Sequence, residues 1–200
     1  MTVIESQYFP PIEYFTLLKI HRTINIDGHE YFVKQTYRNR CHILSANGIL
    51  TLSVPVLGAG KKIISSSMEI DYKQKWLNNH WRAIISAYNK SPFFEYFADD
   101  IKKILFHQHK LIFELNRQIL TFCLKVLKLD TSICYTTQYI EKENEGIYDL
   151  RSAIHPKKEY IERNIYRPKP YSQVFGSKFV PNLSILDLLF CEGPNAGHYL

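Results

Sequence analysis

The sequence lacks the cysteine patterns that hold structural metals or build disulfide frameworks. Its four cysteines are scattered along 200 residues, with no CxxC pair and no zinc-like spacing. Cys123 and Cys191 lie in apolar helical patterns and are expected to be small buried hydrophobic residues. We therefore expect no metal site, and a protein that works in a reducing compartment.

Long apolar runs are also absent. The most apolar stretch, residues 110–129, is interrupted by charged residues, namely Glu114, Arg117, Lys125 and Lys128. No transmembrane span is predicted from such a stretch. Residues 1–20 contain no basic segment followed by an apolar run, which is the pattern of a secretory signal. These absences lead us to expect a cytoplasmic protein.

The glycine-rich and catalytic motifs of several large enzyme classes are missing. The sequence contains no GxGxxG, GxxxxGK[ST], GxSxG or HExxH. Dinucleotide binding through a glycine fingerprint, P-loop chemistry, the hydrolase nucleophile elbow and zincin chemistry are therefore not expected. No particular cofactor is indicated, and the oligomeric state is left open.

Charge is modest but unevenly placed. The net charge is +6, and residues 151–178 alone carry seven Lys or Arg against two Glu, which gives +5. This basic segment leads directly to the start of an apolar helix. Such a pattern favours an anionic small molecule, for which a nucleotide sugar is one candidate, and makes a nucleic-acid partner the least expected.

The hydrophobic pattern alternates between strand-like and helical periods. Strands are predicted for 2–9, 23–32, 49–56 and 132–140, and for 61–72 as the neighbour of 49–56. Helices are predicted for 12–20, 74–88, 109–129 and a segment that starts at Ser91-Pro92. The order predicts a single mixed α/β domain over 1–200 with a helical middle, compatible with a Rossmann-like arrangement. Residues 141–178 are expected to be irregular and to wrap the domain.

The last helix carries strong end signals. Ser184 is predicted as its N-cap, with Asp187 at the third helical position as a variant of the capping box. Gly193-Pro194 should end it, and its apolar residues on nearly all sides predict burial. Three polar residues near its start are not needed for the cap and are the better candidates for substrate contacts: Tyr171, Gln173 and Asn182. Ser184 is a further candidate, although its role as a cap of a core element explains it as well.

Two arginines form a second candidate site. Arg38, Asn39 and Arg40 follow a predicted strand, and in an extended backbone the two guanidinium groups would face the same side. They could then hold a phosphate or carboxylate in bidentate fashion. The alternative is a solvated loop.

A histidine on a helix face is the candidate proton acceptor. His80 shares a face of the helix 74–88 with Ile84 and Tyr88, and histidine titrates near neutral pH. A histidine bonded to a backbone carbonyl is the competing interpretation. Asp27 and His29 are one residue apart on a predicted strand, but a metal pair there would need a third ligand.

Several blocks together resemble the WbqC-like protein family. They occur in the expected order and span almost the whole chain: QYFPPIEYF (7–15), YRNRC (37–41), LSVPV (52–56), HWRAIISAYNKSPFFEYF (80–97) and YSQVFGSKFVPNLSILDLLFCEGP (171–194). The last block is the most specific.

The resemblance implies a role in the biosynthesis of bacterial surface polysaccharide (O-antigen). A glycine or other acyl transferase acting on a sugar is the activity that it suggests. In that hypothesis Arg38 and Arg40 hold an anion, the polar residues near the last helix orient sugar hydroxyls, and His80 accepts the proton. The alternative is a non-catalytic domain that binds an anionic metabolite or a protein partner.

Overall fold

A parallel sheet and a group of helices form the architecture. The structure is a computed structural model that describes residues 1–58, 60–141 and 145–200. Strands β1, β2, β5 and β6 make one sheet in the order β5–β2–β1–β6, with every pair parallel. The strands are Thr2–Glu5, Thr23–Asp27, Ser132–Tyr135 and Tyr148–Asp149. The predicted mixed α/β class is confirmed.

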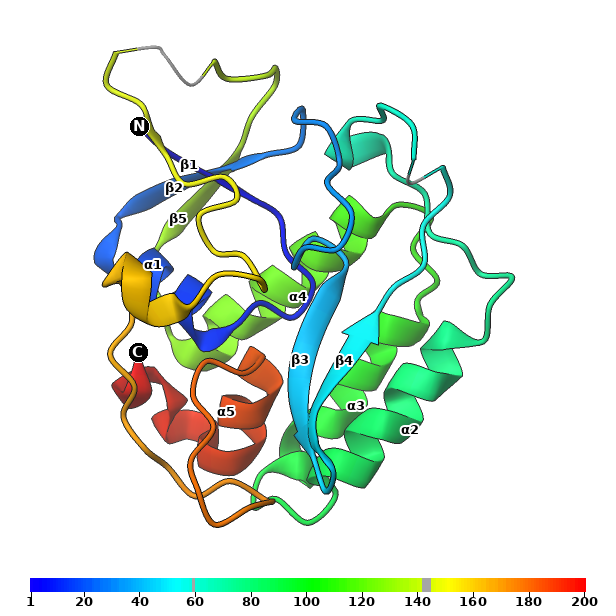
Figure 1. The fold of residues 1–200 in the computed structure, drawn as a ribbon, viewed down its shortest axis with the longest axis vertical. Helices are drawn as coiled ribbons and strands as arrows, with labels where there is room; N and C mark the ends of the chain where they lie inside the picture. Colours follow the sequence, from blue (N-terminus) through cyan, green and yellow to red (C-terminus); the bar gives the residue numbers. More distant parts are fainter. Residues whose placement is uncertain (59, 142–144) are drawn as a thin grey trace.

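Five α-helices accompany the sheet, and most of their bounds agree with the periodicity. They are α1 (Ile12–Ile20), α2 (Trp76–Tyr88), α3 (Phe94–Phe106), α4 (Ile112–Leu127) and α5 (Ile185–Glu192). Short 3₁₀ segments are η1 (Ser65–Ser67), η2 (Tyr160–Arg163) and η3 (Gly193–Tyr199). The parallel strands lie at one end of the molecule, and α4 runs between them and the helices α2 and α3 (Figure 1).

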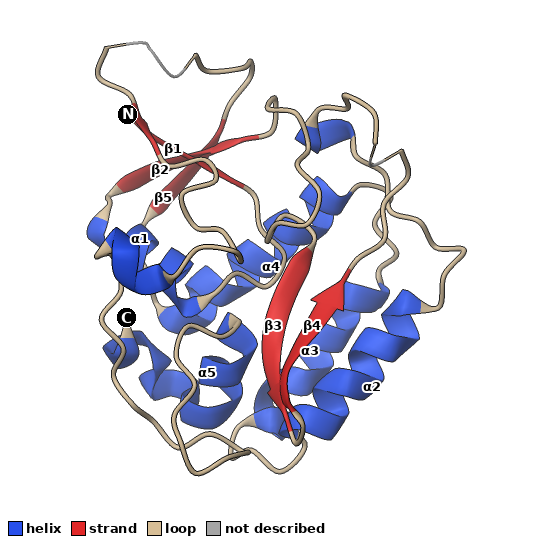
Figure 2. Ribbon diagram, viewed as in Figure 1, coloured by secondary structure: helices blue, strands red, loops and turns tan. Residues whose placement is uncertain are grey.

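The partner of strand 49–56 was predicted incorrectly. Strand β4 (Gly48–Ser53) pairs antiparallel with β3 (Arg40–Ser45), which precedes it, rather than with residues 61–72. A two-residue loop, Ala46-Asn47, joins the paired ends, and Gly48, the first residue of β4, has a positive φ of 97° that glycine adopts without strain. The hairpin packs against α2, as Figure 2 illustrates. Residues 61–72 contain η1 and isolated bridges instead.

The start of α3 also differs from the prediction. Its N-cap position is Phe93, and Ser91 lies two residues before it. The Ser91 hydroxyl donates to the Tyr88 carbonyl at 2.6 Å, so it satisfies the end of α2 rather than the start of α3. Ser91 lies between two helices that follow each other closely, so its hydroxyl could bond to the end of α2 or to the start of α3. Here it bonds to the end of α2.

One contiguous hydrophobic core joins the sheet, the hairpin and the helices. Seven of the eight residues of α5 are buried, as its all-round apolar pattern predicts. Cys123 and Cys191 are buried free thiols, as expected. Within the described residues, no helix combines the length and apolarity that crossing a membrane requires.

The two ends of the chain are hydrogen-bonded to each other through the backbone. The Ile12 amide donates to the Leu183 carbonyl at 3.0 Å, and the Ile185 amide donates to the Pro10 carbonyl at 2.8 Å. The Ser184 amide donates to His42 of β3 at 2.8 Å. The starts of α1 and α5 are therefore fixed together beside the hairpin.

Sheet order decides which residues can form a site. Strands β1 and β2 form the centre of the sheet. Strand β5 pairs with β2 on one side, and the last strand, β6, pairs with β1 on the other side, so the direction in which strands are added reverses at the centre. In open parallel sheets, ligands bind beyond the carboxyl ends of the strands near such a reversal. The Rossmann-like arrangement itself stays a prediction.

Replacing Gly193 should destabilise the protein more than replacing Gly48. Both residues have positive φ, but a Cβ at Gly193 would overlap the ring of Phe93, whereas a Cβ at Gly48 meets nothing within 4 Å. We expect Gly193→Ala to lower the free energy of unfolding by about 2 kcal/mol or more, and Gly48→Ala by about 1 kcal/mol. Urea denaturation of both variants checks this, and equal losses would contradict the packing argument.

Candidate functional site

Polar side chains gather where the parallel strands end. Glu5 is the last residue of β1, Asp27 the last of β2 and Asp149 the last of β6, while Thr136 follows β5. Because these ends lie at one edge of the sheet, residues from four distant segments meet there. Asp27 and Glu5 are buried almost completely.

Arg151 neutralises two of these carboxylates. Its Nε and Nη2 donate to the two oxygens of Asp149 at 2.9 and 2.8 Å, and Nη1 donates to Oδ2 of Asp27. Nη2 also donates to the carbonyl of Ile140 at 2.7 Å. Burial alone would lower the pKa of Arg151, but the two aspartates raise it, so the guanidinium stays charged.

A short hydrogen-bond chain fixes the tautomer of His29. Thr136 Oγ1 lies 2.9 Å from Oδ1 of Asp27 and 3.2 Å from Nδ1 of His29. The hydroxyl has one proton, and it goes to the carboxylate, which cannot donate. His29 Nδ1 therefore carries the proton that Thr136 accepts, and in the neutral imidazole Nε2 has the free lone pair. No described residue bonds to Nε2.

The imidazole of His29 lines a cavity of about 510 Å³, referred to below as the His29 cavity. Its lining residues are His29, Glu30, Tyr31, Val33, Ile64, Tyr139, Arg151 and Ser152. Tyr31 and Tyr139 are 59% and 42% exposed there. The Arg151 guanidinium stacks on the Tyr139 ring at 4.8 Å, which orients the ring. The size suits a small polar ligand.

A second buried ion pair, between Arg38 and Glu30, lies beside the His29 cavity, which Glu30 lines. Arg38 Nε and Nη2 donate to the two oxygens of Glu30, each at 2.7 Å. Arg38 Nη2 also donates to the hydroxyl of Ser152 at 3.1 Å. Burial raises the pKa of Glu30, and the hydrogen bond and charge of Arg38 oppose that rise.

Ser152 has an unusual backbone at this edge. Its φ is 61°, in the left-handed region that a residue with a Cβ seldom occupies. Its amide donates to Oε2 of Glu5 at 2.8 Å, and Gln7 donates to Oε1 of Glu5 at 2.7 Å. The carboxylate at the end of β1 therefore holds Ser152 in a conformation that places its hydroxyl at the cavity.

The predicted arginine clamp is arranged differently from expectation. Residues 37–39 form a turn rather than an extended segment, and only Arg40 begins β3. Arg38 is buried against Glu30, Asn39 donates to the Val54 carbonyl at 2.8 Å, and Arg40 has a buried Nε. Their role in substrate binding is untested and stays a prediction, but two of the three already have partners inside the protein.

The predicted residues near the last helix are brought together around two acids. Tyr171 and Gln173 donate to Oδ2 of Asp187 at 2.7 and 2.9 Å. Asn182 donates to Glu13 at 3.1 Å and accepts from the Glu13 amide at 3.0 Å, while Arg163 pairs with the same carboxylate. These contacts give the polar residues a structural role. Whether they also contact a substrate stays a prediction.

Ser184 is the N-cap of α5, as predicted, and its oxygen accepts from the Leu186 amide at 3.3 Å. The capping box is not formed, because the Ser184 amide donates to His42 and Asp187 is turned to Tyr171 and Gln173. Burial raises the pKa of Asp187, and the hydrogen bonds from its neighbours lower it.

His80 lies in the core rather than in a cavity. It is 5% exposed, the Tyr8 hydroxyl is 3.0 Å from Nδ1, and Trp76 packs edge-on against its ring. Burial lowers its pKa to about 4, although a hydrogen bond to the Ser53 backbone acts in the opposite direction. His80 is therefore neutral at physiological pH and fully enclosed. Its proposed catalytic role is untested.

The described residues contain no group of three or more His, Cys, Asp or Glu side chains suited to a metal ion. Asp27 and His29 do lie together, but through the backbone. The His29 amide donates to Oδ1 of Asp27 at 2.8 Å, and Thr136 separates the two side chains. Their chemistry is that of a hydrogen-bond chain.

The sequence model of the WbqC-like protein family matches residues 5–164 and 157–199. The chain belongs to the WbqC-like protein family. An uncharacterized protein of Mycobacterium tuberculosis (strain ATCC 25618 / H37Rv), Rv1507c, is 25% identical over 224 residues, which cover 100% of this chain and 96% of that protein. No solved structure matches the chain significantly.

Two of the family-like blocks of this WbqC-like protein hold the two ends of the chain together. Block 7–15 supplies Glu13 and block 171–194 supplies Asn182, which hold each other. The His29 cavity draws on residues outside all five quoted blocks, except for Arg38 behind it. Its sequence signal is weaker, because Asp27 and Thr136 lie inside the predicted strands 23–32 and 132–140, and only the structure shows that β2 ends at Asp27 and that β5 ends just before Thr136.

His80 should make the stability of this WbqC-like protein depend on pH. Its folded pKa of about 4 lies below the ordinary value of 6.5, so the unfolded chain binds a proton that the folded chain excludes. Stability should be complete above pH 6.5 and fall as the pH drops toward 4, by at most about 1.4 kcal/mol per pH unit. Denaturation at several pH values should give a shallower slope for His80→Asn, and an unchanged slope would contradict this.

Arg38 should stabilise the fold mainly by compensating the buried charge of Glu30. Arg38→Met leaves a buried carboxylate without its partner and should cost about 3–5 kcal/mol of unfolding free energy. The double variant Glu30→Met/Arg38→Met removes both charges and should recover most of that loss. Denaturation of the single and double variants measures the coupling. A double variant as unstable as Arg38→Met would show that Arg38 acts through other contacts.

Proposed function

We propose that this protein is an enzyme of bacterial surface-polysaccharide (O-antigen) biosynthesis that transfers an acyl or aminoacyl group, such as glycyl, to a sugar. Family membership supports the biological setting. The observation that carries the enzymatic part is the chain Asp27–Thr136–His29, which leaves the Nε2 lone pair of His29 free at a cavity. An imidazole oriented in this way is a general base for an amine or hydroxyl nucleophile.

In the proposed reaction, the sugar nitrogen or oxygen attacks the acyl carbonyl carbon. His29 Nε2 takes the proton of the attacking group, a new bond to the acyl carbon forms, and the bond from that carbon to the leaving group breaks. The leaving group then receives the proton from Nε2. Asp27 stabilises the imidazolium through Thr136, because the Nδ1 proton is donated to Thr136 Oγ1 and the Thr136 hydroxyl donates its own proton to the buried carboxylate.

The cavity walls suit a sugar. Tyr139 is held on one face by Arg151, so its other face can pack against the C–H groups of a sugar ring. Tyr31 supplies a second exposed ring and Ser152 a hydroxyl whose backbone is fixed by Glu5. In this proposal Arg38 positions Ser152, and His29 rather than His80 is the base, because His80 is enclosed in the core.

A non-catalytic domain that binds an anionic metabolite or a protein partner is the second candidate. The observation that favours it is the saturation of the central groups. The guanidinium groups of Arg151 and Arg38 already donate hydrogen bonds to carboxylates of the protein. Such a cavity can bind a ligand without turning it over.

His29→Asn should abolish transfer while the fold is kept. We expect the transfer rate of His29→Asn to fall by about 10²-fold or more, and that of Thr136→Val by about tenfold. Thr136→Ser keeps the hydroxyl and should keep a rate close to that of the wild-type protein. Mass spectrometry of amino sugars and nucleotide amino sugars incubated with glycyl and acetyl thioesters measures the products. His107→Asn, on an exposed histidine outside the cavity, is the matched control.

The pH profile separates catalysis from structure. If His29 is the base, Thr136→Val should shift the acidic limb of the profile as well as lower the rate, since it cuts the link to Asp27. Wild-type activity in His29→Asn would eliminate the base assignment. Sugar binding by the wild-type protein with no turnover of any donor would instead favour the non-catalytic candidate.

A further inference from the structure

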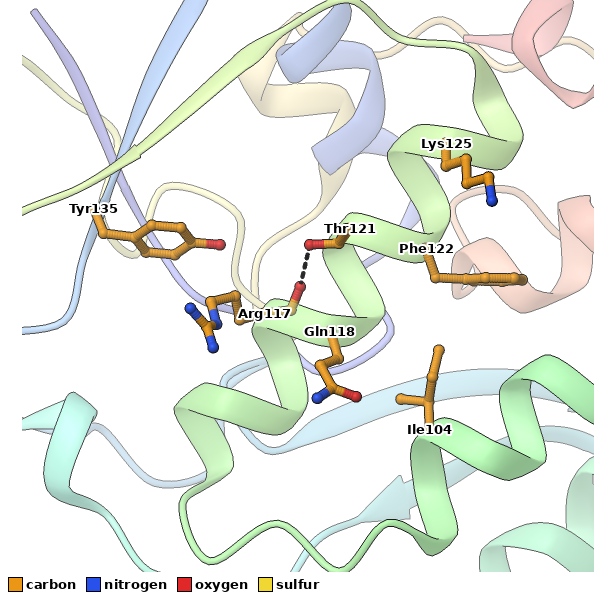
Figure 3. Close-up of a pocket in the computed structure, with 7 residues that line it drawn as sticks. All are labelled: Ile104, Arg117, Gln118, Thr121, Phe122, Lys125 and Tyr135. Carbon is orange, nitrogen blue, oxygen red and sulfur yellow. Dashed lines mark hydrogen bonds between the residues drawn. The ribbon is translucent and has the colours of Figure 1, made fainter.

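A second pocket lies against the outer side of α4, next to the end of β5. It is an open hollow of about 490 Å³, referred to below as the α4 pocket, and its lining residues are Ile104, Arg117, Gln118, Thr121, Phe122, Lys125 and Tyr135. No lining residue is acidic, and two are cationic. Figure 3 shows the side chains of Arg117, from α4, and Tyr135, from β5, pointing toward one another across the opening.

Arg117 and Tyr135, which are both exposed to solvent, have no side-chain acceptor in the part of the chain that the structure describes. Among the described residues, the guanidinium of Arg117 makes no ion pair, and neither it nor the hydroxyl of Tyr135 makes a side-chain hydrogen bond. Glu114, one turn away on α4, forms no ion pair with Arg117 in this part of the chain. Two unpaired donors that face each other over a hollow are satisfied together by an oxygen-rich anion between them.

The Tyr135 hydroxyl acts as a donor at neutral pH. Burial raises the pKa of Tyr135, and the nearby charge of Arg117 lowers it by a smaller amount, so the phenol stays protonated. The ring is 38% exposed and packs edge-on against Phe113 at 5.9 Å. Its hydroxyl is therefore presented from a fixed ring.

The other lining groups complete an anion site with an apolar side. Thr121 donates its proton to the Arg117 carbonyl at 2.9 Å and contributes only an acceptor. Lys125 lies two turns beyond Arg117, about 12 Å along the helix, so it adds positive potential more than a direct contact to the same group. Phe122 and Ile104 give an apolar wall that suits a base or sugar.

We infer that the α4 pocket binds the phosphate groups of a nucleotide-linked substrate, with Arg117 and Tyr135 as the direct ligands. The identification of the nucleotide as part of a substrate rests on the proposed function, whereas the binding of phosphate does not. The two sites are connected along the chain, because Tyr135 directly precedes Thr136 of the hydrogen-bond chain to His29. Phe113, which packs on Tyr135, also lies against Gly28, the residue before His29, where an added Cβ would be 3.1 Å from its ring.

Titration calorimetry of the full chain with inorganic pyrophosphate and with uridine diphosphate tests this inference. Arg117→Gln should weaken binding of both probes at least tenfold, because it removes the charge and the paired donors. Tyr135→Phe should weaken both several-fold without changing the charge. Arg82→Gln, on an exposed arginine of α2 outside the pocket, loses the same charge and should bind like the wild-type protein.

The outcomes separate this inference from the proposed function. Equal binding by Arg117→Gln and Arg82→Gln, or no binding of either probe by the wild-type protein at millimolar concentration, would overturn the phosphate site. His29→Asn should bind both probes with unchanged affinity. Loss of transfer in His29→Asn together with unaffected binding in Arg117→Gln would therefore sink the phosphate site and leave the catalytic proposal standing.

Discussion

The guanidinium of Arg151 is the interaction on which the arrangement of the sheet edge depends. It joins the ends of β2 and β6 through Asp27 and Asp149, and it binds the segment after β5 through the Ile140 carbonyl. Its side chain is 2% exposed and that of Asp27 is fully buried. Without it, the fully buried carboxylate of Asp27 would lose its ion-pair partner. The same cation also orients Tyr139, so the geometry of the His29 cavity follows from one charge.

The fold was largely predictable because its elements follow local periodicity. Helices α1, α2 and α4 end within a few residues of the predicted bounds, since their apolar residues recur with the helical period. Strand β3 was missed because RCHILS follows a turn and alternates only weakly, and β6 because two residues carry no period at all. Strand β6 is defined by its pairing with β1, which lies far away along the chain, and propensity does not encode such pairing.

The site could be predicted only in fragments. The sequence shows Asp27 and His29 as near neighbours. Thr136, Asp149 and Arg151 join them because the parallel strands β2, β5 and β6 all end on the same side of the sheet. Spacing along the chain gives no sign of that order. The sequence pattern instead predicts ligand contacts for the polar residues of the last family-like block. Buried polar groups need partners whether or not a ligand is present, so Tyr171, Gln173 and Asn182 fit a protein core equally well.

The backbone links between residues 9–12 and 183–185 have a consequence for biosynthesis. The carbonyls of Phe9 and Pro10 accept hydrogen bonds from Ser184 and Ile185, and the Ile12 amide is matched by Leu183. A ribosome adds residues 183–185 long after residues 9–12, so α1 leaves the exit tunnel before the backbone groups at its start can find these partners. Contacts of such sequence separation slow folding. The nascent chain therefore leaves residues 9–12 without these partners until residues 183–185 have been synthesised, and apolar surface exposed in such an interval favours aggregation or chaperone binding.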